Sequence, residues 1–269
     1  AEAAYCAELV QQSGRPWSDW AILYRTNAQS MGFESEFLRR KIPYRVVGSL
    51  KFYEREEVKD ALALAAFCSN PRDEVAFRRI VNKPPRGIGA KAQDRLVFEA
   101  LSYTGADLGN LERALEKLGP GLAARAKSGV REFSALMARS RELLEAGGGL
   151  APSPGRLDLP IDNKDALLRS GDGLSIFFVR LSLESGIAAY HQGQDEVAGT
   201  QRLANLQELA NAASLYECSP DGLALFLEHI ELDRAEQEAV SDNAVTFITI
   251  HNTKGLEFPR VIMSGVEQG

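Results

Sequence analysis

Short, mostly apolar runs lie near both ends of the chain. They are Trp20–Tyr24, Tyr44–Val47, Val245–Ile250 and Val261–Met263. The last two runs are short and β-branched, so they predict buried strands of a parallel sheet. Between the first two runs, apolar residues such as Phe33 and Phe37 recur at helical spacing. This order predicts a β-α-β unit.

The long middle of the chain shows helical spacing and almost no strand pattern. Val58, Ala61, Leu62 and Ala65 form one apolar stripe at i, i+3, i+4 and i+7. Acidic residues from Glu54 onward favour a helix start there. Other helices are expected at about 2–13, 72–82, 90–102, 106–118, 121–146, 174–190, 196–215 and 220–231.

These two patterns predict the fold class, which is α/β with a large all-α inserted domain. Residues 1–52 and 241–269 are expected to form parts of one parallel-sheet domain, and residues 53–240 the helical insertion. The segment 147–172 is rich in glycine, proline and other turn formers. It predicts a long surface excursion, and composition favours a simple loop.

Composition narrows the classes of protein. The chain has 269 residues, 45% hydrophobic and 25% charged, with a net charge of −6. Its three cysteines and three histidines are scattered. This distribution indicates reduced thiols and argues against a disulfide framework or a metal site. No apolar run is long enough to span a membrane, and we expect a cytoplasmic location. The chain begins within a helical pattern, so we expect it to be part of a longer protein.

A basic window interrupts this acidic chain. Residues 75–95 carry six basic residues and one acidic residue. Within the window, Pro84 and Pro85 end one helix, and Gly87-Ile88-Gly89 predicts a tight turn into the next. Ile88 is expected to point into the core, while the glycines let backbone N–H groups approach an anion. This arrangement is typical of a hairpin that grips the phosphate backbone without reading bases. The alternative is an ordinary turn with a solvated charged face.

A polar cluster follows the third apolar run. The segment Thr249–Pro259 holds His251, Lys254, Gly255 and Glu257 between two predicted strands. Open parallel sheets bind ligands at the carboxyl ends of their strands. We therefore expect this segment to be part of a ligand site.

Several segments together resemble the UvrD/Rep/PcrA helicases of superfamily 1, and they occur in that family's order. They are Ala21–Ser30, Ile42–Gly48, Lys51–Asp60, Asn82–Gly89, Arg202–Leu209 and Thr249–Pro259. The last segment is similar to helicase motif V and is the most specific. The resemblance covers most of the chain. It implies a C-terminal piece of an ATP-dependent 3′→5′ DNA helicase, with part of its RecA-like domain 2A and the whole of domain 2B.

The resemblance also implies residue roles. Single-stranded DNA would contact Arg25, Asn27, His251 and Lys254. ATP would contact Glu257, through its ribose, and Gly255. Duplex DNA would contact Arg86, Gly87, Ile88, Gly89 and Lys91. The implied cofactors, ATP and Mg²⁺, belong to the whole helicase, and the implied partners are a single-strand/duplex DNA junction, helicase domains 1A and 1B, and repair or replication proteins.

Some features depart from the family pattern. The sequence has no Gly-x-x-x-x-Gly-Lys-Ser/Thr phosphate loop. We therefore expect no catalytic residue, bound cofactor or ATP hydrolysis in this chain alone. Each implied role also has an ordinary alternative: a surface ion pair for Arg25, a hydrogen-bonded strand-end histidine for His251 and a helix-cap carboxylate for Glu257. Two other functions stay open: a helicase-derived regulatory or protein-interaction module, and a nuclease-fused relative.

Overall fold

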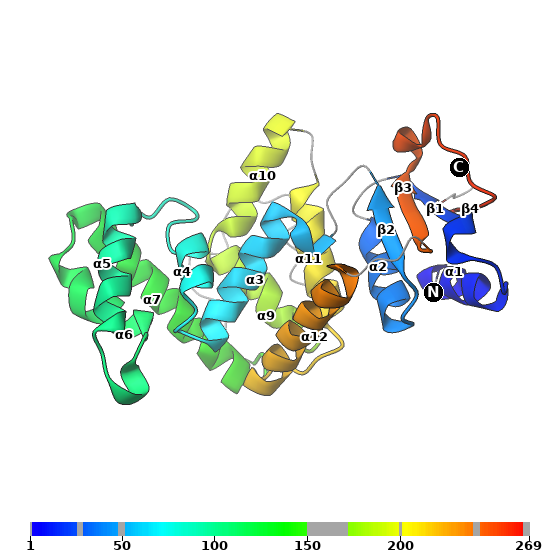
Figure 1. Cartoon of the computed structure of the whole chain (residues 1–269). Helices are drawn as coiled ribbons and strands as arrows, with labels where there is room; N and C mark the ends of the chain where they lie inside the picture. The colour runs from blue at the N-terminus through cyan, green and yellow to red at the C-terminus, as the bar shows by residue number, and fades with distance from the viewer. Residues whose placement is uncertain are drawn as a thin grey trace. The chain divides into compact units, whose positions relative to one another are not determined.

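The computed structural model describes residues 2–25, 29–47, 52–149, 172–198, 201–238 and 243–265. The chain divides into two compact units (Figure 1). One comprises residues 1–55 and 228–269, and the other residues 56–227. Each unit is described below by itself.

The first unit contains a four-stranded parallel sheet with the order β2-β3-β1-β4. Its strands are β1 (Trp20–Tyr24), β2 (Tyr44–Val47), β3 (Val245–Thr249) and β4 (Arg260–Met263). In the register, Tyr24 lies opposite Thr249 and Tyr44 opposite Val245. The predicted parallel sheet is confirmed, and so is its completion by the two ends of the chain, because β3 lies between β1 and β2. The expected burial of Val261–Met263 is wrong, because β4 is an edge strand whose Val261 and Met263 side chains are 47% and 57% exposed.

Aromatic packing holds β3 in the centre of this sheet. The Phe247 ring stacks on Tyr44, with centroids 4.8 Å apart, and meets Phe37 edge-on at 4.9 Å. Phe37 belongs to α2 (Ser30–Arg39), which packs against α1 (Glu2–Gln12). Both helices contribute to one apolar cluster with Phe247. Aromatic pairs of this geometry add about 0.5–1.5 kcal/mol each beyond their burial.

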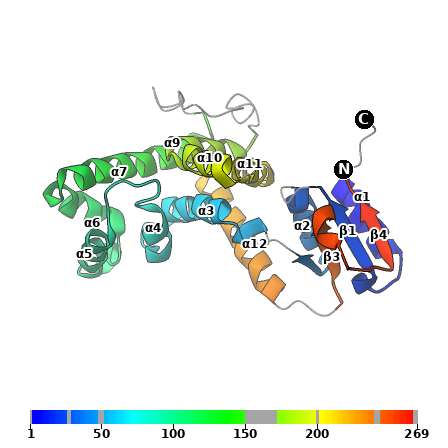
Figure 2. The same ribbon diagram turned by 90° about the horizontal axis from the view of Figure 1, so that it is seen from above.

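The second unit is helical throughout its described residues. Its helices are α3 (Glu56–Ser69), α4 (Glu74–Ile80), α5 (Ala90–Leu101), α6 (Leu111–Leu118), α7 (Ala124–Glu145), α9 (Ser175–Glu184), α10 (Ile187–Ala198), α11 (Arg202–Ala213) and the start of α12 (Pro220–Glu238). Helix α3 packs on α4, α9 and α11, and α5 packs on α6. The long helix α7 runs from α6 to α9 (Figure 2).

Four expected helices differ from the structure. The helix expected at 196–215 begins only at Arg202, and residues up to Ala198 belong to α10. The helix expected at 174–190 is two helices, because Gly186 adopts a φ of 83° that ends α9. The helix expected at 106–118 begins at Leu111, after the 3-10 turn η4 (Gly105–Asp107). The helix expected to end at about residue 231 continues to Glu238. Of the predicted excursion 147–172, residues 150–171 lie outside the described part.

Candidate nucleic-acid interface

The carboxyl ends of β1 and β3 share one edge of the sheet. These strands are parallel neighbours, with Tyr24 opposite Thr249. Arg25 directly follows β1, and the 3-10 turn η6 (Ile250–Thr253) directly follows β3. The structure therefore brings Arg25 and His251 to the same edge, although they are far apart in the sequence.

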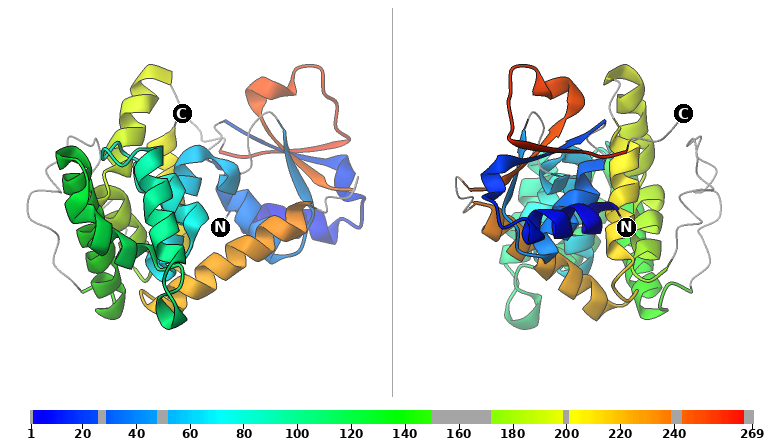
Figure 3. Two further views of the ribbon diagram at one scale, coloured as in Figure 1. Left: turned by 60° about the vertical axis from the view of Figure 1, so that its left-hand side comes forward. Right: turned by 90° about the vertical axis from the view of Figure 1, so that its right-hand side faces the viewer.

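The segment after β3 is a compact turn that exposes its polar side chains. The Thr253 hydroxyl donates to the Ile250 carbonyl at 2.7 Å. The Leu256 N–H donates to the Thr253 carbonyl at 3.0 Å. Gly255 has a φ of 84°, a conformation that favours glycine. The chain then turns back into β4 (Figure 3). The side chains of His251, Lys254 and Glu257 are exposed.

The described residues decide between some of the alternatives for these side chains. Glu257 is followed by β4 and not by a helix, so the helix-cap interpretation is wrong. Within the described part of the chain, the side chains of Arg25, His251 and Glu257 have no ion pair or hydrogen bond. Asn27 lies outside the described residues. The exposed groups at this edge are thus a guanidinium, an imidazole, an ammonium and a carboxylate.

A second polar feature is the hairpin between α4 and α5, residues 81–89. The Asn82 Oδ1 atom accepts from the N–H groups of Arg86, at 2.8 Å, and Ile88, at 3.1 Å. From α5, the Gln93 amide donates to the Ile88 carbonyl at 2.8 Å. Gly87 has a φ of 78°, and Gly89 caps α5. Ile88 is fully buried. The predicted tight turn with Ile88 in the core is confirmed.

The arginine of this hairpin faces inward. Its NH1 atom donates to the carbonyls of Lys83, at 2.8 Å, and Ile80, at 3.1 Å. Its NH2 atom donates to the Ser185 carbonyl at 2.7 Å. The Arg86 guanidinium carbon also lies 5.7 Å from the centre of the Phe133 ring. These contacts direct the Arg86 guanidinium toward the end of α9 and toward α7 rather than toward solvent.

Other cations of the basic window are paired within the protein. Arg78 pairs with Glu74, at 2.7 Å, and with Asp94, at 2.8 Å. Arg79 and Lys83 pair with buried Asp60, each at 2.7 Å. Such pairing cancels part of the positive charge counted from the sequence.

Two cations of the window stay available. Lys91 and Arg95 lie one turn apart on the exposed face of α5, and neither has a partner among the described residues. Lys91 and Arg95 therefore provide the accessible positive charge of residues 75–95.

A buried cluster of charged and polar groups lies behind the hairpin. The Asp60 carboxylate is inaccessible and contacts Lys83 Nζ at 2.7 Å and His191 Nε2 at 2.9 Å. Arg202 NH1 lies 3.3 Å from His191 Nδ1. Because arginine is only a donor, Nδ1 must accept, and Nε2–H donates to Asp60. Glu56 joins the cluster through Lys83, at 2.6 Å, and Arg202, at 2.7 Å.

The ion pairs of this cluster outweigh burial. Burial raises the pKa of Asp60, but the hydrogen bonds from His191 and Lys83 bring that pKa below its usual range. Hydrogen bonds from Lys83 and Arg202 lower the pKa of Glu56 to about 2. Burial lowers the pKa of Lys83, and its bonds to Asp60 and Glu56 raise it above the ordinary value. Both carboxylates and the ammonium are therefore charged at neutral pH.

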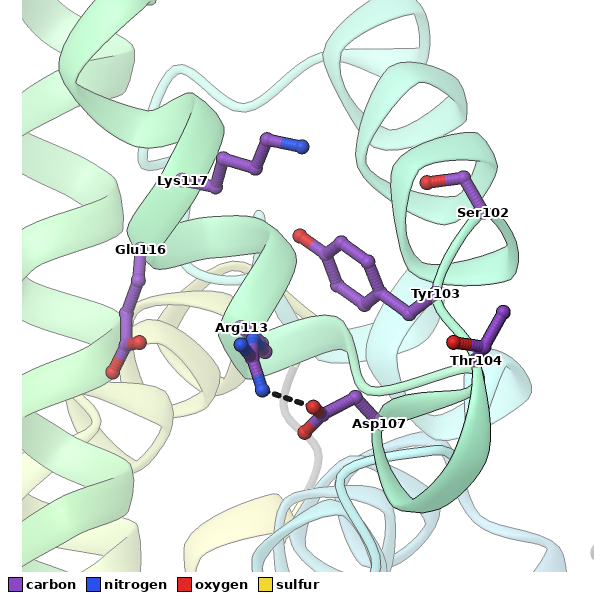
Figure 4. A pocket seen from close by; sticks show the side chains of 7 residues that line it. All are labelled: Ser102, Tyr103, Thr104, Asp107, Arg113, Glu116 and Lys117. Atoms are coloured by element: carbon purple, nitrogen blue, oxygen red, sulfur yellow. Dashed lines mark hydrogen bonds and ion pairs between the residues drawn. The ribbon is translucent and has the colours of Figure 1, made fainter.

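A surface hollow of about 700 Å³ lies between the end of α5, η4 and α6 (Figure 4). Arg113 pairs with Asp107, and Lys117 pairs with Glu99 at 2.5 Å. Both cations lie over the Tyr103 ring, 5.8 and 5.6 Å from its centre. Because each cation already has a carboxylate partner, the hollow does not favour an anionic ligand.

Two further findings concern only the residues that the structure describes. Among them, no helix combines the length and apolar character needed to cross a bilayer. In the same residues, no group of three or more His, Cys, Asp or Glu side chains is placed to hold a metal ion.

Comparison with known proteins identifies the family. A model of the UvrD-like helicase C-terminal domain matches residues 1–113 and 156–269, which is most of the chain. The chain belongs to this family. The resemblance seen in the sequence is thereby confirmed, and it includes both the sheet edge and the hairpin described above.

Curated relatives of this UvrD-like chain include complete helicases. DNA helicase II of Haemophilus influenzae is 32% identical over 278 residues, which is all of this chain and 34% of that protein. DNA helicase II of Escherichia coli is 33% identical over 267 residues, 96% of this chain and 33% of that protein. ATP-dependent DNA helicase PcrA of Bacillus subtilis is 30% identical over 274 residues, 97% of this chain and 33% of that protein. The chain spans about a third of the length of these relatives.

Some residues that shape the UvrD-like hairpin were missed in the sequence. Asn82 immediately precedes the basic turn, and an Asn at such a position is a known turn signal. Asp60 and His191 gave no signal, because 131 positions separate them along the chain. Their pairing depends on helix packing that no local pattern encodes.

Proposed function

We propose that this chain is the DNA-gripping part of an ATP-dependent DNA helicase that moves 3′→5′ and acts in repair or replication. Residues 1–52 and 241–269 are assigned to domain 2A, and residues 53–240 to domain 2B. The observation that supports this best is the sheet edge where Arg25 and His251 lie exposed, with no side-chain partner among the residues that the structure describes. The proposed partners are a DNA junction, helicase domains 1A and 1B, and repair or replication proteins, in the cytoplasm.

The sheet edge is proposed to contact single-stranded DNA. Arg25, Asn27, His251 and Lys254 are assigned to it. Arg25 and Lys254 are exposed cations suited to phosphate oxygens. The His251 imidazole can donate to a phosphate or stack on a base. Such contacts hold a strand without reading its sequence.

The far side of the same turn is proposed to contact ATP. Glu257 is exposed and without a partner among the described residues, so its oxygens can accept from two ribose hydroxyls. Among the described residues, no atom lies within 4 Å of a Cβ atom built on Gly255, which leaves space beside the backbone. ATP with Mg²⁺ supplies the hydrolysis that drives movement in the whole helicase. This chain offers residues for the ribose and no phosphate loop, so it is expected to hydrolyse no ATP alone.

The hairpin is proposed to contact duplex DNA. Gly87 and Gly89 are exposed and let the backbone approach a phosphate, and Lys91 adds a charge. Ile88 anchors the turn in the core. Arg86 is assigned to holding the hairpin in shape, because its guanidinium donates to backbone carbonyls.

A salt titration with a labelled single-strand/duplex junction tests this proposal. Binding should be weak and fall steeply as salt rises. Arg25→Ala should weaken binding to the single strand alone, and Lys91→Ala binding to the duplex alone. Arg131→Ala removes an equal charge from the face of α7 opposite Gly129, which contacts the hairpin, and serves as the control. Absence of binding at low salt would refute the assignment.

A protein-interaction module is the second candidate, and one observation favours it. Phe98 and Leu101 on α5 are 78% and 60% exposed, an apolar pair unusual for a solvated helix face. A chain that binds no DNA at low salt, yet loses a protein contact on Phe98→Ser, would support this alternative.

A further inference from the structure

The hairpin lacks an available arginine of its own. Arg86, the arginine in the turn, is bonded to the carbonyls of Lys83 and Ser185 at 2.8 and 2.7 Å. Moving that guanidinium to a phosphate would leave these acceptors unsatisfied and the turn unsupported. If the hairpin grips duplex DNA, its bidentate phosphate ligand must come from elsewhere.

Helix α7 lies directly against the hairpin. A Cβ atom built on Gly129 would overlap the Arg86 carbonyl oxygen and lie 2.7 Å from the Arg86 Cβ. A Cβ atom built on Gly87 would lie 2.8 Å from Cγ of Arg125 and 3.2 Å from the backbone nitrogen of Ala126. Both contacts are closer than ordinary side-chain packing. The absence of side chains at Gly87 and Gly129 is what lets the first turns of α7 touch the turn.

Arg125 is the cation that this contact places beside Gly87. It is exposed, and it has no hydrogen bond or ion pair among the described residues. Its aliphatic stem rests on the glycine of the hairpin, while its guanidinium stays accessible. The window cations Arg79 and Lys83, in contrast, are held by Asp60.

We propose that Arg125 is a phosphate-binding residue of the hairpin, contacting the duplex backbone next to Gly87. This inference rests on the duplex-binding part of the proposed function. A planar guanidinium binds a phosphate through two parallel hydrogen bonds, which a lysine cannot reproduce. Arg125, from α7, thereby provides the accessible guanidinium, whereas that of Arg86 is bonded to backbone carbonyls. Duplex contacts then come from two segments that lie more than thirty positions apart.

Untailed duplex DNA of mixed sequence is the probe, because it isolates this surface from the sheet edge. Affinity is measured from 25 to 200 mM salt for the whole chain and its variants. Arg125→Met keeps the aliphatic stem against Gly87 and removes the charge. It should weaken binding about ten-fold at low salt and reduce the salt slope by about one. Arg125→Lys should keep the slope and lose part of the affinity.

Arg131→Met is the matched control. Arg131 is also exposed on α7 and has no partner among the described residues, but it lies on a different helix face from Arg125. It should leave affinity and slope unchanged. If Arg125→Met behaves as Arg131→Met does, while the unaltered chain binds duplex, the inference fails and the proposed function stands. If the unaltered chain does not bind duplex, the proposed function itself fails. Unchanged thermal unfolding of Arg125→Met shows that its effect is on binding.

Discussion

The buried cluster behind the hairpin allows a sharp test through Asp60→Asn. The substitution keeps the shape of the side chain and removes its charge. The Asp60 carboxylate is fully buried and contacts Arg79, Lys83 and His191 within 2.9 Å. The new amide would also direct N–H donors toward groups that are donors themselves.

The expected loss of stability depends on which other contacts Lys83 and Arg79 keep when the Asp60 charge is removed. Breaking a buried ion pair costs about 3–5 kcal/mol. Lys83 keeps its contact with Glu56, and Arg79 is a third exposed and can hydrate, so the low end applies. We therefore expect about 3 kcal/mol less stability. For a unit of this size that corresponds to a melting temperature lower by about 6–12 °C.

Asp94→Asn is the matched control. Asp94 also pairs with an arginine, Arg78, at 2.8 Å, but it is 66% exposed. It should lose less than about 1 kcal/mol. Urea unfolding, followed by circular dichroism of the helices, measures the stability of both variants. Lys83→Met, alone and combined with Asp60→Asn, completes a double-mutant cycle. Equal losses for Asp60→Asn and Asp94→Asn would refute the argument that burial makes this cluster structurally important.

Three further outcomes are expected. Glu56 has a pKa of about 2 in the folded chain, below its ordinary value, so its stabilising effect is present above about pH 4.5 and disappears toward pH 2. Since Glu56 is 45% exposed, Glu56→Gln should cost only about 1 kcal/mol in urea unfolding at pH 6, and progressively less as the pH falls toward 2. Gly129→Ala should destabilise by about 1–3 kcal/mol because its methyl group meets Arg86, whereas Gly193→Ala in α10, with open space around it, should stabilise by up to about 1 kcal/mol. Burial raises the pKa of the Cys68 thiol to about 12, so Ellman's reagent should leave it unreacted at pH 8 until the chain is unfolded.

The sheet was predictable because its signal is local. Each strand is a short apolar run, and the parallel order follows from the helix between β1 and β2. The helices were predictable for the same reason, whereas their ends were not. Gly186 ends α9, where its position lies against Pro84, and that contact comes from tertiary packing.

The candidate site was only partly predictable. The tight turn at Gly87 follows from glycine, which adopts a positive φ without steric cost. The burial of Ile88 follows from its apolar side chain, which stands between two glycines in a window of charged residues. The charge of the window does not, because the sequence shows cations and not their partners. Arg79 and Lys83 lie near Asp60 only because α3 and α4 pack together. A count of basic residues therefore overstates the positive surface.

The way Arg86 is held has a consequence for how this surface can change over evolutionary time. Its donors go to main-chain carbonyls, which every residue type provides. Substitutions at Lys83 or Ser185 leave those main-chain acceptors in place. The backbone conformation of the hairpin therefore does not depend on which side chains stand at these two positions. The exposed cations Lys91 and Arg125 can then be exchanged independently of that conformation. Affinity for a ligand can therefore change through the exposed cations, while the backbone geometry of the hairpin stays the same.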